Sequence, residues 1–244
     1  KGVIMKVFLT GASGGLGRHL IRFLTSQRNC EIKVLVHNSP VDFSGCSTVK
    51  GDLLDAGSLV EATRGGVDMV VHLAALTHSN SRVDYFRINV DGTKNLLEAC
   101  TANGIQRFIH VSTGAACPDG GDYSESKLRA EELVKASGLQ WVILRPSEVY
   151  GPDSPDAINK LIKWIQTLMV VPVIGDGRYV LSASYIDDVI SVMSQCAFDP
   201  DMTGRILVVS GPEQMTYVEL VDRICHFLHV KRFKVFVPVV LVKA

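Results

Sequence analysis

Tyr123 and Lys127 are spaced four residues apart in the segment Tyr-Ser-Glu-Ser-Lys. At the start of a helix, side chains at this spacing project from the same face. A free tyrosine has a pKa of about 10, and a nearby cation stabilises the phenolate and lowers that pKa. The pair is therefore suited to exchange a proton with a substrate hydroxyl or carbonyl.

Two hydroxyl side chains, Ser112 and Thr113, lie at the end of the expected strand that precedes this helix. Ligands of parallel sheets bind at the carboxyl ends of the strands, so such a hydroxyl is placed to polarise the oxygen on which the tyrosine acts. The alternative is structural, because a tyrosine and a lysine at this spacing also form surface pairs, and a strand-end hydroxyl often only caps a helix. We interpret Ser112, Thr113, Tyr123 and Lys127 as catalytic because a glycine-rich loop precedes them.

This loop reads Gly-Ala-Ser-Gly-Gly-Leu-Gly at residues 11–17, between an expected strand and an expected helix. Glycines at these positions permit a tight turn and let a pyrophosphate approach the backbone N–H groups at the helix N-terminus. The spacing is G-x-x-G-x-x-G rather than G-x-G-x-x-G, so an ordinary glycine-rich turn is the alternative. The loop residues expected to bind a dinucleotide are Gly11, Ser13, Gly14, Gly15, Leu16 and Gly17.

The end of the second expected strand indicates which dinucleotide is bound. NAD sites place an acidic residue there to bind the adenosine ribose, whereas this chain has His37 and Asn38. Arg18, directly after the last glycine, can supply positive charge to a 2′-phosphate, although a solvated helix face explains it equally well. The sequence favours NADP(H), with NAD(H) as the alternative.

The elements that position these residues alternate along the first 150 residues, where short β-branched runs are separated by helix-length amphipathic segments. This alternation is typical of a parallel sheet with crossover helices. We predict an α/β fold, in which residues 1–150 form a Rossmann-type doubly wound parallel sheet that binds NAD(P). The predicted strands are residues 3–10, 31–37, 47–51, 68–73, 107–112 and 140–145, and the predicted helices are residues 17–27, 58–63, 85–103 and 123–137.

Residues 151–244 are punctuated by proline and glycine. We predict that they form a smaller C-terminal substrate-binding region, partly interwoven with the first, with helices at residues 156–167, 187–197 and 216–228. The chain ends directly after an apolar run, and we expect the natural protein to continue past Ala244.

The composition excludes several classes of function. Lys and Arg number 25, as do Asp and Glu, and no block of like charge occurs, which argues against a nucleic-acid partner. No apolar run approaches the roughly 20 residues of a membrane helix, and no signal peptide is recognisable. The six cysteines include no C-x-x-C pair, so we expect reduced thiols, no metal site and a cytoplasmic location. The expected partner is a small-molecule substrate.

Two histidines, His72 and His110, lie inside apolar strands. Histidines in such positions are more often hydrogen-bonded core residues than ligands. We interpret both as satisfied core residues.

Taken in chain order, the motifs resemble those of the extended or atypical short-chain dehydrogenases/reductases, in the NAD(P)-dependent epimerase/dehydratase family. The resemblance spans nearly the whole chain. The segments that carry it are Thr10–Gly17, Gly51–Leu53, Val71–Ala75, Asn89–Leu97, Tyr123–Lys127, Leu144–Pro146, Tyr150–Pro152 and Tyr185–Val189.

The resemblance implies further roles for individual residues. Asn89 would hold the geometry of the sheet and the cofactor, Lys127 would also bind the nicotinamide ribose, and Pro146 would border the nicotinamide. Thr113 matches the family's catalytic hydroxyl better than Ser112 does. Contacts with the adenine are implied for Asp52 and Leu53, and contacts on the ribose side for Leu73, Ala74 and Ala75.

Two departures from the family pattern bear on the substrate. Only nine residues separate Thr113 from Tyr123, where nucleotide-sugar epimerases have a much longer loop, and this short form resembles atypical members that bind NAD(P)H without confirmed turnover. Residues 180–185 lack the arginine that grips the phosphates of a sugar nucleotide. Smaller or more apolar substrates therefore rank above nucleotide sugars. Many family members pair through helices that match residues 85–103 and 123–137, which implies a homodimer.

The leading hypothesis is an NAD(P)-dependent oxidoreductase, epimerase or dehydratase, in which hydride passes between the nicotinamide and a carbonyl or alcohol carbon of the substrate. Tyr123 would move the proton, Lys127 would tune the tyrosine, and Thr113, alone or with Ser112, would polarise the oxygen. The alternative is a non-catalytic NAD(P)H-binding redox sensor or assembly protein, which the short loop before Tyr123 favours.

Overall fold

The computed structural model of the chain describes residues 4–27, 29–37, 44–152, 154 and 156–241. Its contacts group into two units. The first comprises Lys1–Pro146 with Asp187–Val209, and the second comprises Ser147–Ile186 with Ser210–Ala244. The chain thus leaves the first unit after residue 146, returns to it at residue 187 and ends in the second.

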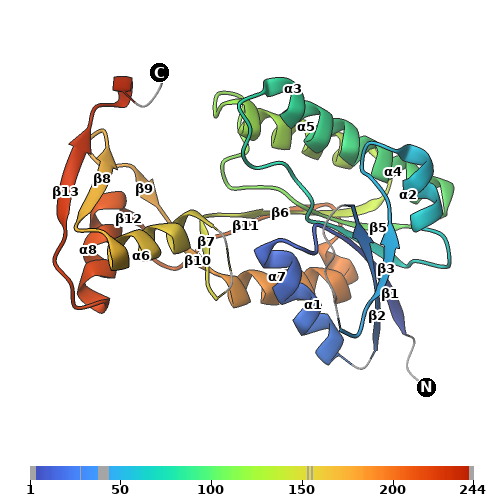
Figure 1. Cartoon of the computed structure of the whole chain (residues 1–244). Coiled ribbons are helices and arrows are strands. Elements are labelled where there is room, and N and C mark those ends of the chain that lie inside the picture. Colours follow the sequence, from blue (N-terminus) through green and yellow to red (C-terminus); the bar gives the residue numbers. More distant parts are fainter. Residues whose placement is uncertain (1–3, 28, 38–43, 153, 155, 242–244) are drawn as a thin grey trace. The chain divides into compact units, whose positions relative to one another are not determined.

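The first unit is built on a seven-stranded parallel sheet in the order β11-β6-β5-β4-β1-β2-β3 (Figure 1). The strand order reverses between β1 and β4, which is the position where doubly wound sheets bind their ligands. The predicted Rossmann-type doubly wound sheet is confirmed, and β11 adds a strand that the sequence pattern did not indicate. The strands are β1 (Met5–Thr10), β2 (Cys30–Val36), β3 (Ser47–Lys50), β4 (Met69–His72), β5 (Arg107–Val111), β6 (Gln140–Pro146) and β11 (Arg205–Val209).

Helices cover both faces of this sheet, with α2, α4 and α5 on one side and α1 and α7 on the other (Figure 1). The single helix predicted over residues 85–103 is wrong in detail, because the structure has three successive helical segments there, the middle one a π-helical turn. The helical segments are α1 (Gly15–Ser26), α2 (Ala56–Ala62), α3 (Arg82–Phe86), η1 (Arg87–Asp91), α4 (Gly92–Ala102), α5 (Asp122–Ala136), α7 (Ile186–Phe198) and the 3-10 turn η2 (Pro200–Met202).

The main core cluster lies between the sheet and α2, α4 and α5. Phe8, Val70 and Phe108 stand in register on β1, β4 and β5, and each is 0% exposed. Leu96 of α4 and Val134 of α5 belong to the same cluster. Full burial of such a side chain stabilises the fold by about 1.5–3 kcal/mol. This packing holds α5, which carries Tyr123 and Lys127, against the sheet.

In its described residues, the second unit has three two-stranded sheets, two α-helices and a short 3-10 turn. Ile165 of α6 and Val221 of α8 are buried in its core together with Val171 of β8. Thr216 and Glu219 form a capping box that starts α8, which satisfies backbone donors at its N-terminus. The role of this unit in substrate binding stays a prediction. Its elements are β7 (Val149–Tyr150) paired with β10 (Ser184–Tyr185), β9 (Val180–Leu181) with β12 (Met215–Thr216), β8 (Val170–Ile174) with β13 (Phe233–Val237), α6 (Ala157–Thr167), α8 (Tyr217–Phe227) and η3 (Val239–Leu241).

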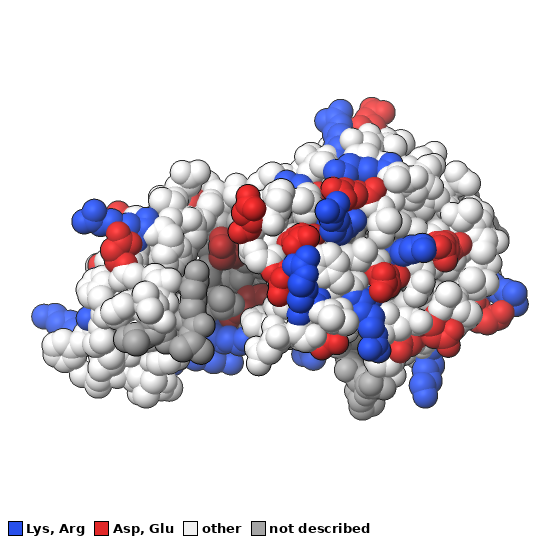
Figure 2. Space-filling view, turned by 90° about the horizontal axis from the view of Figure 1, so that it is seen from above, with Lys and Arg blue, Asp and Glu red and all other residues white. Residues whose placement is uncertain are grey.

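Within the described part of the chain, no helix combines the length and the apolar character that a membrane crossing requires. Acidic and basic side chains are interspersed on the face of the first unit that Figure 2 shows, in its right-hand part. This mixture agrees with the equal numbers of basic and acidic residues in the sequence.

Candidate functional site

A pocket of about 500 Å³ lies in the first unit at the carboxyl ends of β1 and β2. The volume falls within the range typical of small-molecule and cofactor sites. Of the residues that the sequence singles out as cofactor contacts, the pocket brings together Gly11, Ser13, His37, Asp52, Leu53, Ala74 and Ala75. The sequence pattern gave no expectation for its other lining residues, which are Thr10, Ala12, Leu35, Val36, Gly51, Leu54, Leu76, Arg87 and Ile88.

The glycine loop forms the tight turn from β1 into α1. Gly11 has a φ of +75°, in the left-handed region that favours glycine. A Cβ at Gly11 would lie 2.5 Å from the backbone nitrogen of Ala74, and a Cβ at Gly17 would lie 2.4 Å from the carbonyl oxygen of Gly11. Both glycines therefore let backbone segments approach more closely than any side chain allows.

The N-terminus of α1 is suited to an anion. Gly14 is the N-cap residue, no side chain caps the helix, and the first turn holds no acidic residue. The first N–H groups of the helix and the positive end of its dipole are therefore not compensated by a side chain of this helix. Ser13 and Gly14 are exposed at this end. A pyrophosphate fits both the charge and the donors of the loop.

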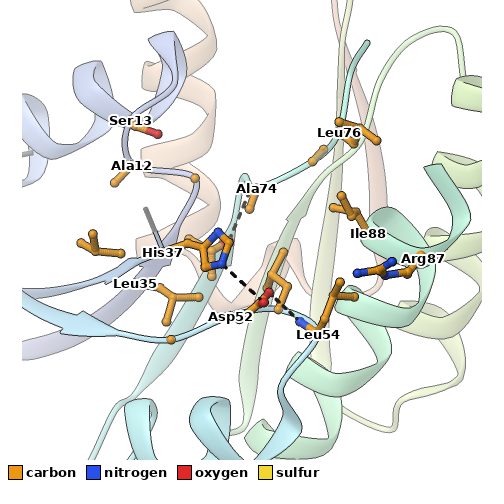
Figure 3. Close-up of a pocket in the computed structure, with 16 residues that line it drawn as sticks. Ala12, Ser13, Leu35, His37, Asp52, Leu54, Ala74, Leu76, Arg87 and Ile88 are labelled. Carbon is orange, nitrogen blue, oxygen red and sulfur yellow. Dashed lines mark hydrogen bonds and ion pairs between the residues drawn. The ribbon is translucent and has the colours of Figure 1, made fainter. Parts of the chain in front are cut away.

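The end of the pocket that His37 and Asp52 line carries mixed charges (Figure 3). His37 Nε2 lies 3.4 Å from Asp52 Oδ2, and Asp52 Oδ1 accepts a hydrogen bond from the Leu54 backbone N–H at 3.0 Å. Arg87 of η1 points its guanidinium into the pocket. Arg18, which we expected to contact a 2′-phosphate, is exposed on α1 and is not among the residues that line the pocket. Asn38 lies outside the described residues.

Lys127 is anchored beside the end of β5. Its Nζ donates a hydrogen bond to the Val111 carbonyl oxygen at 2.9 Å, and the side chain is only 2% exposed. Burial lowers the pKa of Lys127 to about 8, against the opposing attraction of Glu131. Ser112 and Thr113 follow Val111 directly, so the ammonium is held at the backbone position that precedes the two expected hydroxyls.

Thr113 and Tyr123 are both partly exposed. The Thr113 hydroxyl accepts a hydrogen bond from the Ala115 backbone N–H at 3.2 Å. The Tyr123 ring lies 6.0 Å from the ring of Tyr85, centroid to centroid. Tyr123 and Lys127 stand in the first two turns of α5, as their spacing predicts.

An arginine that the sequence pattern did not indicate holds the first turn of α5. Arg82 Nη1 donates to Asp122 Oδ1 at 2.7 Å and to Glu125 Oε2 at 2.8 Å, and its guanidinium lies 4.4 Å from the centroid of the Phe86 ring. The two carboxylates flank Tyr123 in the sequence. Arg82 therefore links α3 to the turn that carries the tyrosine.

Asn89 connects the pocket wall to α5. Its amide accepts a hydrogen bond from the Leu76 backbone N–H at 2.7 Å, and it donates to the Leu76 carbonyl at 3.0 Å and to Ser126 Oγ at 2.9 Å. Asn89 lies in the π-helical turn η1, and such turns occur frequently at functional sites. The role in holding the cofactor that the resemblance implies for Asn89 stays a prediction.

The remaining expected contacts lie around the loop and the strand ends. Leu73 follows β4, and its N–H donates to the Thr10 carbonyl at 3.2 Å. Pro146 ends β6, and its carbonyl accepts from the Gly114 N–H at 2.8 Å. Gly15, Leu16 and Gly17 form the first turn of α1. Among the described residues, no group of three side chains could hold a metal ion.

The two buried histidines, His72 and His110, differ in their hydrogen bonding. His72 is bonded to the hydroxyls of Thr10 at 2.7 Å and Thr93 at 3.0 Å, and burial lowers its pKa to about 3. His110 is 0% exposed, yet neither ring nitrogen has a hydrogen-bond partner within the described part of the chain. The interpretation of His110 as a satisfied core histidine is therefore wrong.

Comparisons with known proteins agree on one family. The model of the NAD dependent epimerase/dehydratase family matches residues 7–209. The chain is 32% identical over 210 residues to the 4-hydroxy-2-methyl-3-oxo-4-farnesyl-3,4-dihydroquinoline-1-oxide ketoreductase of Stigmatella aurantiaca, covering 76% of this chain and 62% of that protein. It is 32% identical over 196 residues to the ceramide reductase of Caulobacter vibrioides, covering 78% of this chain and 60% of that protein. The chain thus spans less than two thirds of the length of either relative.

Among solved structures, MoeE5 in complex with UDP-glucose and NAD is similar, with a TM-score of 0.85 and 25% sequence identity. The match covers 96% of this chain and 85% of MoeE5. The similarity therefore includes both units of the fold.

Proposed function

Because the chain belongs to the NAD dependent epimerase/dehydratase family, we propose that it is an NAD(P)-dependent oxidoreductase that acts on a carbonyl or alcohol carbon of a small molecule. The observation that carries the proposal is the position of Lys127. Its buried ammonium is fixed at the end of β5, next to two hydroxyl residues and four residues along α5 from Tyr123.

The residues present fit a dinucleotide. The amides of the loop from Gly11 to Gly17 would hold the pyrophosphate, and the pocket walls at Asp52 and Ala74 would hold the adenosine. Arg87 lines the same pocket and adds a cation that an anionic cofactor requires. When bound, a nicotinamide dinucleotide supplies hydride transfer.

The side chains of the protein handle the proton. Tyr123 donates a proton to the substrate oxygen in reduction and accepts it in oxidation. Lys127, while charged, stabilises the phenolate form and so brings the tyrosine pKa toward neutral pH. Thr113, with its hydroxyl at the strand end, polarises the same oxygen.

For the substrate, we propose a ketone or secondary alcohol on an apolar skeleton. Two relatives support this class by their names, a farnesyl-dihydroquinoline-oxide ketoreductase and a ceramide reductase. Residues 180–185 carry no arginine to bind a diphosphate. The likeness to MoeE5 with UDP-glucose supports nucleotide sugars as a second candidate. The pairing of two copies through α4 and α5 stays a prediction.

A substrate panel tests the proposal. Consumption of NADPH or NADH is followed by absorbance with apolar ketones, aldehydes and nucleotide sugars. Turnover with apolar ketones supports the proposal, and turnover with nucleotide sugars alone overturns the substrate class. If the chain binds the cofactor but no substrate in the panel is turned over, the non-catalytic sensor is favoured, in line with the short loop before Tyr123.

We expect His37→Asp to change the choice of cofactor. His37 lines the pocket at the end of β2, where a carboxylate binds the ribose of NAD and repels a 2′-phosphate. The variant should bind NADP(H) about tenfold or more weakly, the effect of losing one charged contact, while NAD(H) binds as before or more tightly. Isothermal titration with both cofactors measures this. His37→Asn is the neutral control, and an equal loss of both cofactors in His37→Asp would show that this side chain does not face the 2′ position.

Turnover is expected to fall as the pH rises through about 8, because Lys127, whose pKa is lowered to about 8, then loses its charge. Folding stability should change in the opposite direction. An unfolded lysine has a pKa of about 10.4, so between pH 8 and 10.4 the unfolded chain binds more protons than the folded chain, and the cost of burying the ammonium disappears.

Comparison with Lys127→Met isolates the contribution of Lys127 to the pH dependence of folding stability. The stability of the wild type relative to the variant should rise by about 3 kcal/mol across that range, measured by denaturant titration at several pH values. A difference that does not vary with pH would mean that Lys127 titrates normally.

A further inference from the structure

Three buried polar atoms on one segment have no hydrogen-bond partner among the described residues. They are Nδ1 and Nε2 of His110 and Oγ of Ser112. His110 is 0% exposed and Ser112 is 7% exposed. More than nine in ten buried polar groups in proteins are bonded to protein or to ordered water, and an unmet one costs about 1–3 kcal/mol. Three unsatisfied polar atoms so close in the sequence indicate a site for a polar ligand.

His110 and Ser112 face α5, the helix that carries Tyr123 and Lys127. Residues two apart along a strand point to the same face of the sheet, so His110 and Ser112 share the face of Phe108. Phe108 packs in one cluster with Val134 of α5 and Leu96 of α4. The unmet atoms therefore lie in the layer between β5 and α5.

The ammonium of Lys127 reaches into this layer. It carries three N–H donors, and Val111 O is its one hydrogen-bond acceptor within the described residues. Its positive charge is close enough to contribute to lowering the pKa of His110, for which burial is the larger cause. The donors of Lys127 and the polar atoms of His110 and Ser112 thus lie in the same buried layer.

Two titratable groups, one beside His110 and one beside Lys127, have partners of their own. His72 of β4, with its ring centroid 5.4 Å from that of His110, is bonded to Thr10 and Thr93. Glu131, one turn beyond Lys127 on α5, accepts two hydrogen bonds from Arg145 of β6, at 2.8 and 2.7 Å. Neither group supplies the contact that His110 lacks.

We propose that His110, Ser112 and Lys127 form a binding site for at least one internal water molecule, and that His110 acts through this water as a positioning residue that keeps Lys127 charged. A buried water needs two to four polar partners. Here the water accepts from the Lys127 ammonium and donates to the unprotonated nitrogen of His110 and to Ser112 Oγ. It would replace part of the hydration that burial removes from the ammonium. The role in keeping Lys127 charged for catalysis rests on the proposed function, whereas the water site itself does not.

Two measurements without cofactor or substrate test the site. A high-resolution crystal structure should show an ordered water within hydrogen-bond distance of a His110 ring nitrogen and Lys127 Nζ. Titration of Lys127 by nitrogen-15 NMR should show a pKa that is lower by about one unit in His110→Leu than in the wild type, and restored toward the wild-type value in His110→Asn. An unchanged Lys127 pKa in His110→Leu, or a His110 ring bonded only to protein atoms, would overturn the proposal.

A pH profile of turnover connects the site to catalysis. In His110→Leu the alkaline loss of activity should begin about one pH unit lower than in the wild type, which a merely structural substitution would not produce. If His110→Leu does not fold, Ser112→Ala gives the NMR readout in its place. If the wild type shows no turnover but the pKa of Lys127 still changes in His110→Leu, only the proposed function is contradicted. Turnover with an unchanged Lys127 pKa would contradict this inference alone.

Discussion

Tyr123→Phe is expected to lower kcat by about 10²–10⁴-fold, the usual contribution of general acid–base catalysis. Phenylalanine keeps the ring and removes only the hydroxyl, so packing beside Tyr85 is retained. Cofactor affinity should not change measurably, because Tyr123 does not line the pocket that would hold the adenosine. Steady-state kinetics with the best substrate of the panel, together with cofactor titration, measures both quantities.

Tyr85→Phe is the matched control. The Tyr85 hydroxyl accepts a hydrogen bond from the Ser79 backbone N–H at 2.9 Å, and its ring neighbours that of Tyr123. Loss of this hydroxyl removes a hydrogen bond beside Tyr123 without removing the proton donor, so kcat should stay close to the wild-type value. Equal losses of activity in the two variants would mean that local packing, rather than the phenol of Tyr123, limits turnover.

The second large effect is expected for Gly11→Ala, which should weaken binding of both NAD(H) and NADP(H) by about a hundredfold, corresponding to ~2.7 kcal/mol. The new Cβ would lie 2.5 Å from Ala74 N, 2.6 Å from Leu73 C and 2.8 Å from Ala74 Cα, and all three are backbone atoms that cannot rotate away. The loop must therefore move away from Ala74 and carry its N–H groups with it. A displacement of about 1 Å can lower the function of a binding or catalytic group by about a hundredfold.

Gly66→Ala separates steric clash from backbone strain. Gly66 has a φ of +77°, close to the +75° of Gly11, but a Cβ there would meet no atom within 4 Å. Both variants bear the cost of a left-handed alanine, about 1–2 kcal/mol, while only Gly11→Ala bears the clash. Thermal unfolding should show a smaller loss for Gly66→Ala, and titration should show unchanged cofactor binding. A cofactor affinity that Gly11→Ala leaves unchanged would contradict the assignment of the loop.

The parts of the site that follow from local sequence could be predicted. The glycine loop is a continuous segment whose turn is determined by its own residues, and the spacing of Tyr123 and Lys127 already places them on one helix face. The buried strands of the parallel sheet are also visible as short apolar runs, because both faces of such strands are covered. The pairing of β11 with β6 could not be recognised, since Arg205–Val209 is separated from β6 by the passage of the chain through the second unit.

The parts that depend on packing between distant segments could not be predicted. Arg87 lines the pocket from the π-helical turn η1, and Asn89 in that turn bonds to Leu76 and Ser126. Arg82 reaches α5 across 40 residues of sequence. The unmet nitrogens of His110 depend on which side chains α4 and α5 place over β5. No local pattern carries this information.

The decisive measurement is a crystal structure of the chain with bound NADP(H). We expect the pyrophosphate on the backbone amides of Gly14 to Leu16, the adenosine between His37 and Ala74, and the nicotinamide beside Tyr123 and Lys127. A dinucleotide bound elsewhere, or a nicotinamide that contacts neither of these two side chains, would contradict the assignment of Tyr123 as the group that moves the proton.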